Sequence, residues 1–227
     1  MSDTMKDIPL HLAIDHTLLK PEATEAQVLA LCEEAVAHEF KAVCVNSGFV
    51  TAAARAVQGS AVLVCSVVGF PLGAMSVRAK AAEATIAIEQ GAHEIDTVVP
   101  LGRVLAGDWS GVRSDLSAVR DATPGAVLKV IFETCLLDRE QIVRLCELCT
   151  EAGADFVKTS TGFSSGGATL EDVALMSNSV GTSVQVKASG GIRDRETALA
   201  MLRAGASRLG TSSGVAIVHG STDDAGY

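Results

Sequence analysis

The chain has 227 residues, of which 48% are hydrophobic, 20% are charged and only 4% are aromatic. This length suits a single domain, and a core so poor in aromatic residues must be built from Val, Ala, Leu and Ile, as buried parallel strands prefer. The formal net charge of −9 offers no basic patch, and no apolar run reaches the roughly 18 residues of a membrane span, so we expect binding to neither nucleic acid nor membrane.

Short β-branched runs alternate with Ala-, Leu- and Glu-rich stretches along the chain, and no linker interrupts them. The pattern predicts eight strands, at 11–15, 42–46, 62–68, 94–99, 127–133, 156–160, 184–189 and 208–211. The predicted helices span 24–38, 47–57, 75–90, 110–121, 138–152, 170–178 and 194–204. Eight such units predict an α/β fold, a closed (β/α)8 TIM barrel, as one domain over residues 1–218, followed by a flexible tail at 219–227.

Three of the seven lysines, Lys129, Lys158 and Lys187, lie in apolar strand-like runs and follow one another at intervals of 29 residues. Because this interval matches one strand-plus-helix unit, we expect the three amines on successive strands of a parallel sheet. Loss of water and a second cation nearby both disfavour an ammonium ion, so such a lysine can become the neutral amine that attacks a carbonyl carbon. The arrangement therefore indicates Schiff-base chemistry.

Two carboxylates, Asp15 and Asp96, also occupy apolar strands. We expect them and the three lysines late in their strands, since the active site of an α/β barrel lies at the C-terminal ends of its strands. A structural network of buried ion pairs is the alternative, because such networks also place charges in apolar surroundings. Five converging groups favour catalysis over that alternative.

Two glycine-containing loops follow the last two predicted strands, at 188–192 and 209–214. Barrels often bind phosphate at this position with backbone amides, although a Gly-Gly pair alone more often marks a tight turn. The residues expected to bind a substrate phosphate are Thr161, Gly162, Gly190, Gly191, Ser212 and Ser213.

The remaining candidates carry weaker signals. Cys44 and Phe70 could contribute to the pocket wall, although a thiol at a strand end more often serves packing. Tyr227, the only tyrosine, ends the polar tail, where fraying is usual and a proton-relay role is the alternative. A lone histidine such as His16 is more often a hydrogen-bonded structural residue.

The six cysteines fall mostly in apolar strand or helix patterns, and no secretory hydrophobic segment precedes them. Cys146 and Cys149 form a C-x-x-C pair within a helical run that lacks a second ligand pair. We therefore expect reduced thiols, a cytoplasmic location, no metal site and no cofactor.

The segments FVKTSTGF, VKASGGIRD and LKVIFET together resemble the deoxyribose-phosphate aldolase family. Supporting segments are IDHTLLKPEAT, AVCVNSGFV, VVGFPLGA, EIDTVV and RLGTSSGVAIV, so the resemblance covers nearly the whole chain. It implies a TIM barrel and metal-independent Schiff-base chemistry. The reaction that it implies is the cleavage of 2-deoxy-D-ribose 5-phosphate to acetaldehyde and D-glyceraldehyde 3-phosphate.

At the matching positions, the resemblance implies that Lys158 is the Schiff-base lysine, Lys187 the second catalytic lysine and Asp96 the acid/base carboxylate. Asp15 and Thr17 match the polar pair on the family's first strand. Lys187 is expected to stay protonated and to favour a neutral Lys158, while Lys129 would hold the carboxylates together.

Two residues depart from the family pattern. Thr97 stands where we expect a methionine, and Pro100 stands where a side chain or amide could help shape the rim of the site. We expect altered packing rather than lost chemistry.

Two alternative functions remain open from the sequence. One is another Schiff-base aldolase or a transaldolase acting on a different sugar phosphate, and the other is a non-catalytic barrel that binds phosphate. The expected partners are small-molecule sugar phosphates and aldehydes, and the expected assembly is a homodimer.

Overall fold

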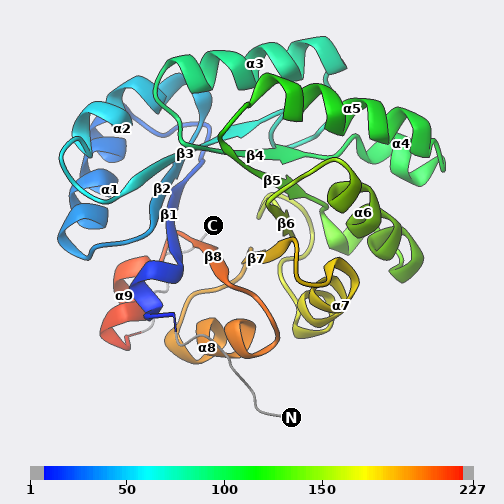
Figure 1. Ribbon diagram of the computed structural model, residues 1–227. Helices are drawn as coiled ribbons and strands as arrows, with labels where there is room; N and C mark the ends of the chain where they lie inside the picture. The colour runs from blue at the N-terminus through cyan, green and yellow to red at the C-terminus, as the bar shows by residue number, and fades with distance from the viewer. Residues whose placement is uncertain (1–7, 222–227) are drawn as a thin grey trace.

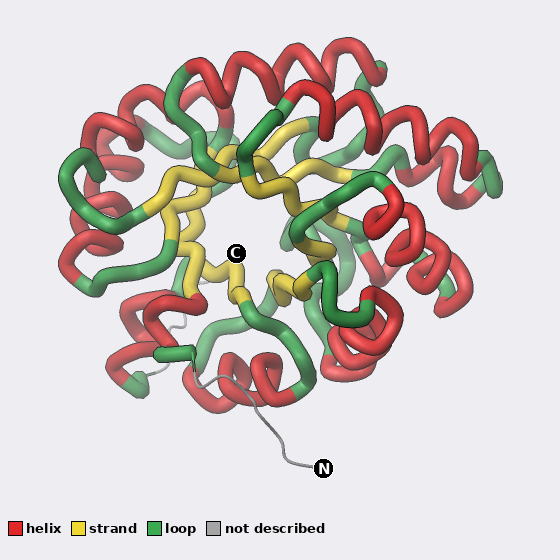
Figure 2. Tube along the Cα trace, in the orientation of Figure 1, coloured by secondary structure: helices red, strands yellow, loops and turns green. Residues whose placement is uncertain are grey.

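The computed structural model describes residues 8–221. In this part of the chain eight parallel strands pair in sequence order, and the last strand pairs with the first, so the sheet closes into a barrel. The strands form the inner ring and the helices surround it on the outside (Figures 1 and 2). The predicted fold class, a (β/α)8 TIM barrel, is confirmed.

The strands are β1 (Ile14–Leu18), β2 (Ala42–Val45), β3 (Leu63–Val68), β4 (Glu94–Val98), β5 (Val127–Ile131), β6 (Phe156–Lys158), β7 (Gln185–Ser189) and β8 (Arg208–Thr211). The α-helices are α1 (Glu25–Ala37), α2 (Val50–Ala56), α3 (Val77–Glu89), α4 (Leu101–Leu105), α5 (Trp109–Ala122), α6 (Arg139–Glu151), α7 (Leu170–Val180), α8 (Arg195–Arg203) and α9 (Gly214–His219). Short 3-10 helices lie at η1 (Leu10–Ala13), η2 (Ser47–Phe49) and η3 (Thr134–Leu136).

The start of the barrel differs from the prediction. Most of the predicted first strand forms the 3-10 helix η1, in which the Leu12 amide donates to the Pro9 carbonyl over 2.9 Å. The strand itself begins at Ile14 and continues through polar residues to Leu18. Apolar content located the other strands, but β1 carries an Asp-His-Thr run, so an apolar-run criterion placed it too early.

Several helices begin at side chains that satisfy free backbone amides. Thr24 and Asp138 form capping boxes with Gln27 and Gln141 at the starts of α1 and α6. Helix α4, which was not among the predicted helices, begins after Pro100, whose carbonyl accepts the Arg103 amide at 2.8 Å. Pro100 therefore starts a short helix on the loop that follows β4.

Alternate residues of each strand face two different surroundings. Ile95, Leu128, Val157 and Val186 belong to the large apolar cluster that the strands share with the surrounding helices. Their neighbours along the chain, among them Asp96 and the three strand lysines, have side chains that meet inside the barrel. The outer layer thus stabilises the fold, while the charged groups lie in the interior.

The C-x-x-C pair of α6 belongs to the outer layer. Both Cys146 and Cys149 are buried there beside Ile142 and Leu145, at the spacing of one helix face. None of the helices in the described residues is both long and apolar enough to cross a membrane.

Candidate active site

The three strand lysines lie on consecutive strands, but at two levels of the barrel. Lys158 ends β6 and pairs in register with Lys187 of β7. Lys129 is the middle residue of β5 and pairs with Asp96 and Phe156, below the level of Lys158. The expectation that all five charged groups lie late in their strands is therefore right only for Lys158: Lys129, Asp96 and Lys187 are the middle residues of their strands, and Asp15 is the second residue of β1. The long lysine side chains bridge the difference in level.

Asp96 is the centre of the cluster. Its Oδ2 accepts hydrogen bonds from Lys158 Nζ and from Lys187 Nζ, each at 2.8 Å. Its Oδ1 accepts from Lys129 Nζ at 2.7 Å, and Cys65 Sγ lies 3.1 Å from the same oxygen. One buried carboxylate therefore links all three amines.

A second layer of charge supports Asp96 from inside the barrel. Lys129 Nζ lies 2.6 Å from Glu94 Oε2, and Lys187 Nζ lies 2.5 Å from Asp15 Oδ2. Arg208 Nη1 donates to Asp15 Oδ1 at 2.6 Å and lies 3.2 Å from Glu94 Oε2. All these side chains are nearly or fully buried, so their geometry is fixed by the barrel.

Glu94 and Arg208 were not among the site residues predicted from the sequence. Glu94 lies two positions before Asp96 on the same strand, and this period-2 spacing is the signal that could have placed it on the same face. Arg208 begins β8, where a charged residue also suits the surface end of a strand. Only closure of the barrel brings it to Asp15 and Glu94.

Mutual attraction in this cluster fixes most of its protonation states. Burial alone would raise the pKa of Asp96, but the charges of Lys129 and its neighbouring amines hold that pKa well below its usual range. The pKa of Asp15 is likewise lowered, because Lys187 and Arg208 outweigh burial. In return, burial lowers the pKa of Lys129 and of Lys187 less than the carboxylates raise it. At neutral pH both aspartates are ionised and these two amines are ammonium ions.

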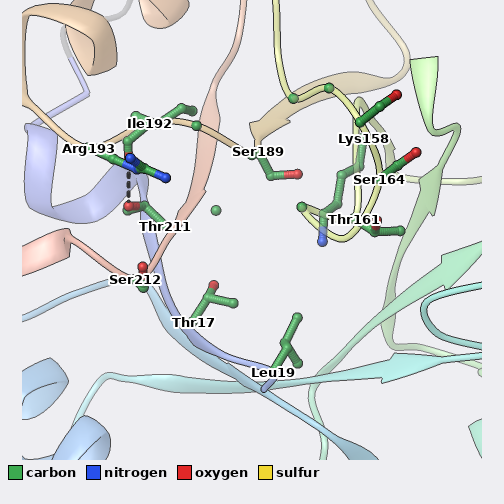
Figure 3. Close-up of a pocket in the computed structure, with 17 residues that line it drawn as sticks. Thr17, Leu19, Lys158, Thr161, Ser164, Ser189, Ile192, Arg193, Thr211 and Ser212 are labelled. Atoms are coloured by element: carbon green, nitrogen blue, oxygen red, sulfur yellow. Dashed lines mark hydrogen bonds between the residues drawn. The ribbon is translucent and has the colours of Figure 1, made fainter. Parts of the chain in front are cut away.

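A cavity of ≈ 220 Å³ opens at the C-terminal ends of the strands, above the charged cluster. Among the described residues that line it, Lys158 is the one lysine. In Figure 3, Lys158 lies on the opposite side of the cavity from Thr211 and Ser212, and Thr17 and Leu19 lie along another edge. The other lining residues are Thr161, Gly162, Ser164, Ser165, Gly166, Gly167, Ser189, Gly190, Gly191, Ile192, Arg193 and Gly210.

Two of the glycine loops have backbone conformations that glycine adopts at little cost. Gly162 has a φ of 86°, and Gly190 and Gly191 have φ of 89° and 80°. The loop after β7 also packs closely on the loop after β6, since a Cβ at Gly190 would lie 2.9 Å from Gly167 Cα. At Gly162, Gly190 and Gly191 the backbone itself therefore forms part of the cavity wall.

Five of the six expected phosphate-binding residues line the cavity, and Ser213 does not. The Ser213 amide donates to Thr211 Oγ1 at 2.9 Å, inside the turn that precedes α9. Thr161 also has an internal partner, because its amide donates to Glu133 Oε1 at 3.2 Å and its hydroxyl donates to the other carboxylate oxygen. These two residues shape the loops rather than present free amides.

Residues 10–220 match the DeoC/LacD family aldolase. The chain belongs to this family.

Curated relatives of this DeoC/LacD family aldolase are similar over nearly their full length. The deoxyribose-phosphate aldolase of Brevibacillus brevis is 56% identical over 215 residues, which cover 94% of this chain and 97% of the relative. That of Finegoldia magna is 55% identical over 211 residues, which cover 93% of this chain and 99% of the relative. The solved structure of the tetrameric deoxyribose-phosphate aldolase from Aeropyrum pernix is 35% identical, with a TM-score of 0.85 over 92% of this chain and 89% of that one.

The remaining sequence candidates take different places in this aldolase. Thr17 lines the cavity, and its hydroxyl donates to the Asp15 carbonyl at 2.8 Å. Cys44 is fully buried and packs with Leu19 in a small apolar cluster inside the barrel, without lining the cavity. Phe70 packs against that cluster and meets the Phe163 ring edge-on, with the ring centroids 5.3 Å apart. Tyr227 lies outside the described residues.

His16 has the structural surroundings expected of it. Its side chain is 2% exposed on the outer side of β1, and its Nε2 lies 2.7 Å from Glu34 Oε2 of α1. Phe40 packs against the imidazole ring. Burial lowers the pKa of His16, and the Glu34 carboxylate only partly offsets this effect.

Proposed function

We propose that this chain is a deoxyribose-phosphate aldolase, which reversibly cleaves 2-deoxy-D-ribose 5-phosphate to acetaldehyde and D-glyceraldehyde 3-phosphate through a Schiff base on Lys158. The position of Lys158 carries the proposal, because its amine lies at the floor of the cavity and 2.8 Å from the Asp96 carboxylate. The names and high identity of the relatives support the same activity.

The ion-pair contacts of the buried basic groups distinguish Lys158 from the others. In the described part of the barrel interior, three carboxylates face four basic groups: Asp15, Glu94 and Asp96 against Lys129, Lys158, Lys187 and Arg208. Full ionisation would bury one positive charge in excess, which is costly in a medium with little water. Lys129 and Lys187 each contact two carboxylates closely, whereas Lys158 contacts only Asp96 and shares the same Oδ2 with Lys187. Lys158 is therefore the buried amine with the fewest carboxylate contacts, and it is the one that lines the cavity.

The chemistry follows from that amine. Lys158 Nζ attacks the aldehyde carbon, and the carbinolamine loses water to give an iminium ion. The iminium nitrogen accepts the electron pair of the C2–C3 bond as that bond breaks and the C3 hydroxyl loses its proton, which releases D-glyceraldehyde 3-phosphate. Protonation of the remaining enamine and hydrolysis of the new iminium ion release acetaldehyde and regenerate the lysine.

Asp96 and Lys187 support these steps. Asp96 Oδ2 contacts both amines at 2.8 Å, so it can exchange a proton with the nitrogen or with the departing oxygen. Lys187 stays an ammonium ion between Asp15 and Asp96, where it shares Asp96 Oδ2 with Lys158. Lys129 holds Asp96 through Oδ1, which leaves Oδ2 directed to the other two amines.

The substrate phosphate would lie at the glycine-rich end of the cavity. We assign its binding to the amides around Gly162, Gly190, Gly191 and Ser212, with Arg193 of the same lining adding positive charge. Anchoring this remote end of the sugar positions the carbonyl carbon at Lys158. Sugars without a phosphate should consequently bind more weakly.

Reduction with borohydride in the presence of acetaldehyde tests the proposal directly. We expect one covalent adduct, located on Lys158 by mass spectrometry of peptides. Lys158→Leu should lose the adduct and the turnover, whereas Lys41→Leu should keep both, because Lys41 precedes β2 at the opposite end of the barrel. Retained turnover in Lys158→Leu would refute the assignment.

Trapping with other sugar phosphates, together with thermal denaturation in the presence of phosphate, separates the two alternative functions. An adduct that forms with another sugar phosphate in preference to 2-deoxyribose 5-phosphate would favour a different Schiff-base aldolase or a transaldolase. Thermal stabilisation by phosphate without any adduct would favour a non-catalytic barrel. A homodimer and a cytoplasmic location remain predictions of the sequence, and light scattering of the purified protein measures the first.

A further inference from the structure

Two thiols that the reaction does not use lie inside the barrel. Cys44 of β2 and Cys65 of β3 are paired in register on neighbouring strands, so their side chains project from the same face of the sheet. Both residues are fully buried in the small apolar cluster that also contains Leu19 and Val67. The spacing of Cys44 and Cys65 along the chain does not predict that they form a pair.

This thiol pair reaches the charged cluster of the proposed active site. Cys65 Sγ lies 3.1 Å from Asp96 Oδ1 and 3.3 Å from Lys129 Nζ. The two sulfur atoms and a carboxylate oxygen of Asp96 all lie within 4.8 Å of one another. Zinc binds thiolate sulfur at about 2.3 Å and carboxylate oxygen at about 2.0–2.2 Å, so small side-chain rotations bring three such atoms around one ion.

We propose that Cys44, Cys65 and Asp96 form a binding site for a thiophilic divalent cation of the zinc class, and that its occupation inhibits the enzyme. The ion replaces two thiol protons: each S–H bond breaks, each sulfur binds the metal as a thiolate, and two protons leave to solvent. This exchange adds no net charge to the barrel, so the nearby ammonium groups do not exclude it. A hard cation such as Mg²⁺ prefers oxygen ligands and should not bind here.

Inhibition follows from the shared carboxylate. Asp96 Oδ1 accepts from Lys129, and the same carboxylate contacts Lys158 through Oδ2. A metal ion that ligates Asp96 Oδ1 replaces Lys129 at that oxygen and draws the carboxylate, with the Oδ2 that exchanges protons, away from Lys158. This second half of the inference rests on the proposed function, whereas metal binding itself does not.

Cadmium provides the test of binding, because cadmium–thiolate bonds absorb in the ultraviolet. Titration of the reduced wild-type protein should give a saturable band at one ion per chain. Cys44→Ser and Cys65→Ser should each weaken binding at least tenfold. The matched control is Cys146→Ser/Cys149→Ser, which removes the buried cysteine pair of α6 and should leave the titration unchanged. A band that persists in the first two variants, or that disappears in the control, would overturn the site.

Wild-type protein gives a second test that needs no variant to fold. Anomalous scattering from cadmium-soaked crystals should locate the ion between Cys44 and Cys65, and an ion found only elsewhere would refute the proposal. Zinc should lower the rate of aldehyde formation at least tenfold, with recovery on chelation and no effect of Mg²⁺. An unchanged rate in crystallographically occupied enzyme would refute the inhibition.

The two proposals can fail separately. A protein that binds cadmium through these thiols but cleaves no deoxyribose phosphate when metal-free would refute the aldolase assignment and leave the metal site standing. An active aldolase that shows no cadmium–thiolate band would refute the metal site and leave the aldolase assignment standing.

Discussion

At the scale of single residues, Thr97 shows the effect of one unusual side chain next to the proposed active site. It is fully buried, and its hydroxyl has no hydrogen-bond partner among residues 8–221. Because an unsatisfied buried hydroxyl is costly, Thr97→Val should raise the free energy of unfolding by about 1 kcal/mol. Urea denaturation of the two proteins measures the difference.

Thr123 provides the matched control for that substitution. It is equally buried, but its hydroxyl donates to the Val119 carbonyl at 2.9 Å. Thr123→Val removes a satisfied hydrogen bond and should lower the free energy of unfolding by about 1 kcal/mol. If both valine variants were destabilised alike, the Thr97 hydroxyl would have a partner after all.

Gly210 of β8 makes room for the second lysine. A Cβ at this position would lie 3.1 Å from Lys187 Cε and 3.0 Å from Ser189 Cβ. Gly210→Ala should therefore push the Lys187 amine away from Asp15 and Asp96, and misplacement of about 1 Å can cost a hundredfold in rate. We expect kcat to fall at least tenfold with a smaller change in KM, as steady-state kinetics would show.

Gly102 offers the comparison, since a Cβ there would meet nothing within 4 Å. It lies in the exposed helix α4, where Gly102→Ala should leave kcat unchanged. Equal losses in the two variants would mean that Lys187 is not the cause.

At the scale of elements, a buried ion pair joins α3, α5 and the end of β4. Lys80 Nζ lies 2.8 Å from Asp115 Oδ2 and donates to the Val98 carbonyl at 2.8 Å. Burial lowers the pKa of Lys80 and raises the pKa of Asp115, so each charge depends on the other. Lys80→Met would leave Asp115 buried without a cation, which should cost about 3–5 kcal/mol of stability.

The double variant Lys80→Met/Asp115→Leu separates charge from packing. It removes both charges together and should recover a large part of that loss, because well-packed apolar residues often replace a buried pair at little cost. Denaturation midpoints of the single and double variants make the comparison. A double variant no more stable than the single one would show that the bond to Val98, rather than the pairing, stabilises this end of β4.

The same elements show what the sequence could and could not predict. Apolar runs located seven strands closely, because each run is buried between the barrel and the helices. They failed for β1, whose polar Asp15, His16 and Thr17 are buried only because both faces of the strand are covered. The regular interval between the lysines correctly predicted that the three amines lie on neighbouring strands. Which groups the amines contact depends on the register of the barrel.

No pattern along the chain could predict the contacts that cross the closed barrel. Arg208 meets Asp15 only because β8 pairs with β1, and it reaches Glu94 of β4 across the barrel interior. The Cys44–Cys65 pair likewise depends on the alignment of two strands. Ser212 and Ser213 lie in the same glycine-containing loop of the sequence, so both were expected to bind phosphate. In the structure the Ser213 amide instead donates to Thr211 Oγ1 in the turn before α9.

At the scale of the whole molecule, the interior charges set how stability depends on acid. The pKa values of Asp15 and Asp96 are lowered in the folded state, so these groups bind protons more readily in the unfolded chain. Their contribution to stability is fully present above their unfolded pKa of about 3.9 and is lost as pH falls below it. Above pH ~5 they should add no slope to the stability profile.

His16 should dominate a different pH window. Its pKa is lowered from 6.5 by burial against α1 and Phe40, so the unfolded chain takes up a proton first as pH falls. Stability should then decline from pH 7.5 to 5.5, with a slope of at most ~1.4 kcal/mol per pH unit for one proton. His16→Gln should flatten this slope and leave the steeper loss below pH ~4 in place. Urea midpoints at several pH values test it, and parallel profiles for the two proteins would show that another group causes the decline.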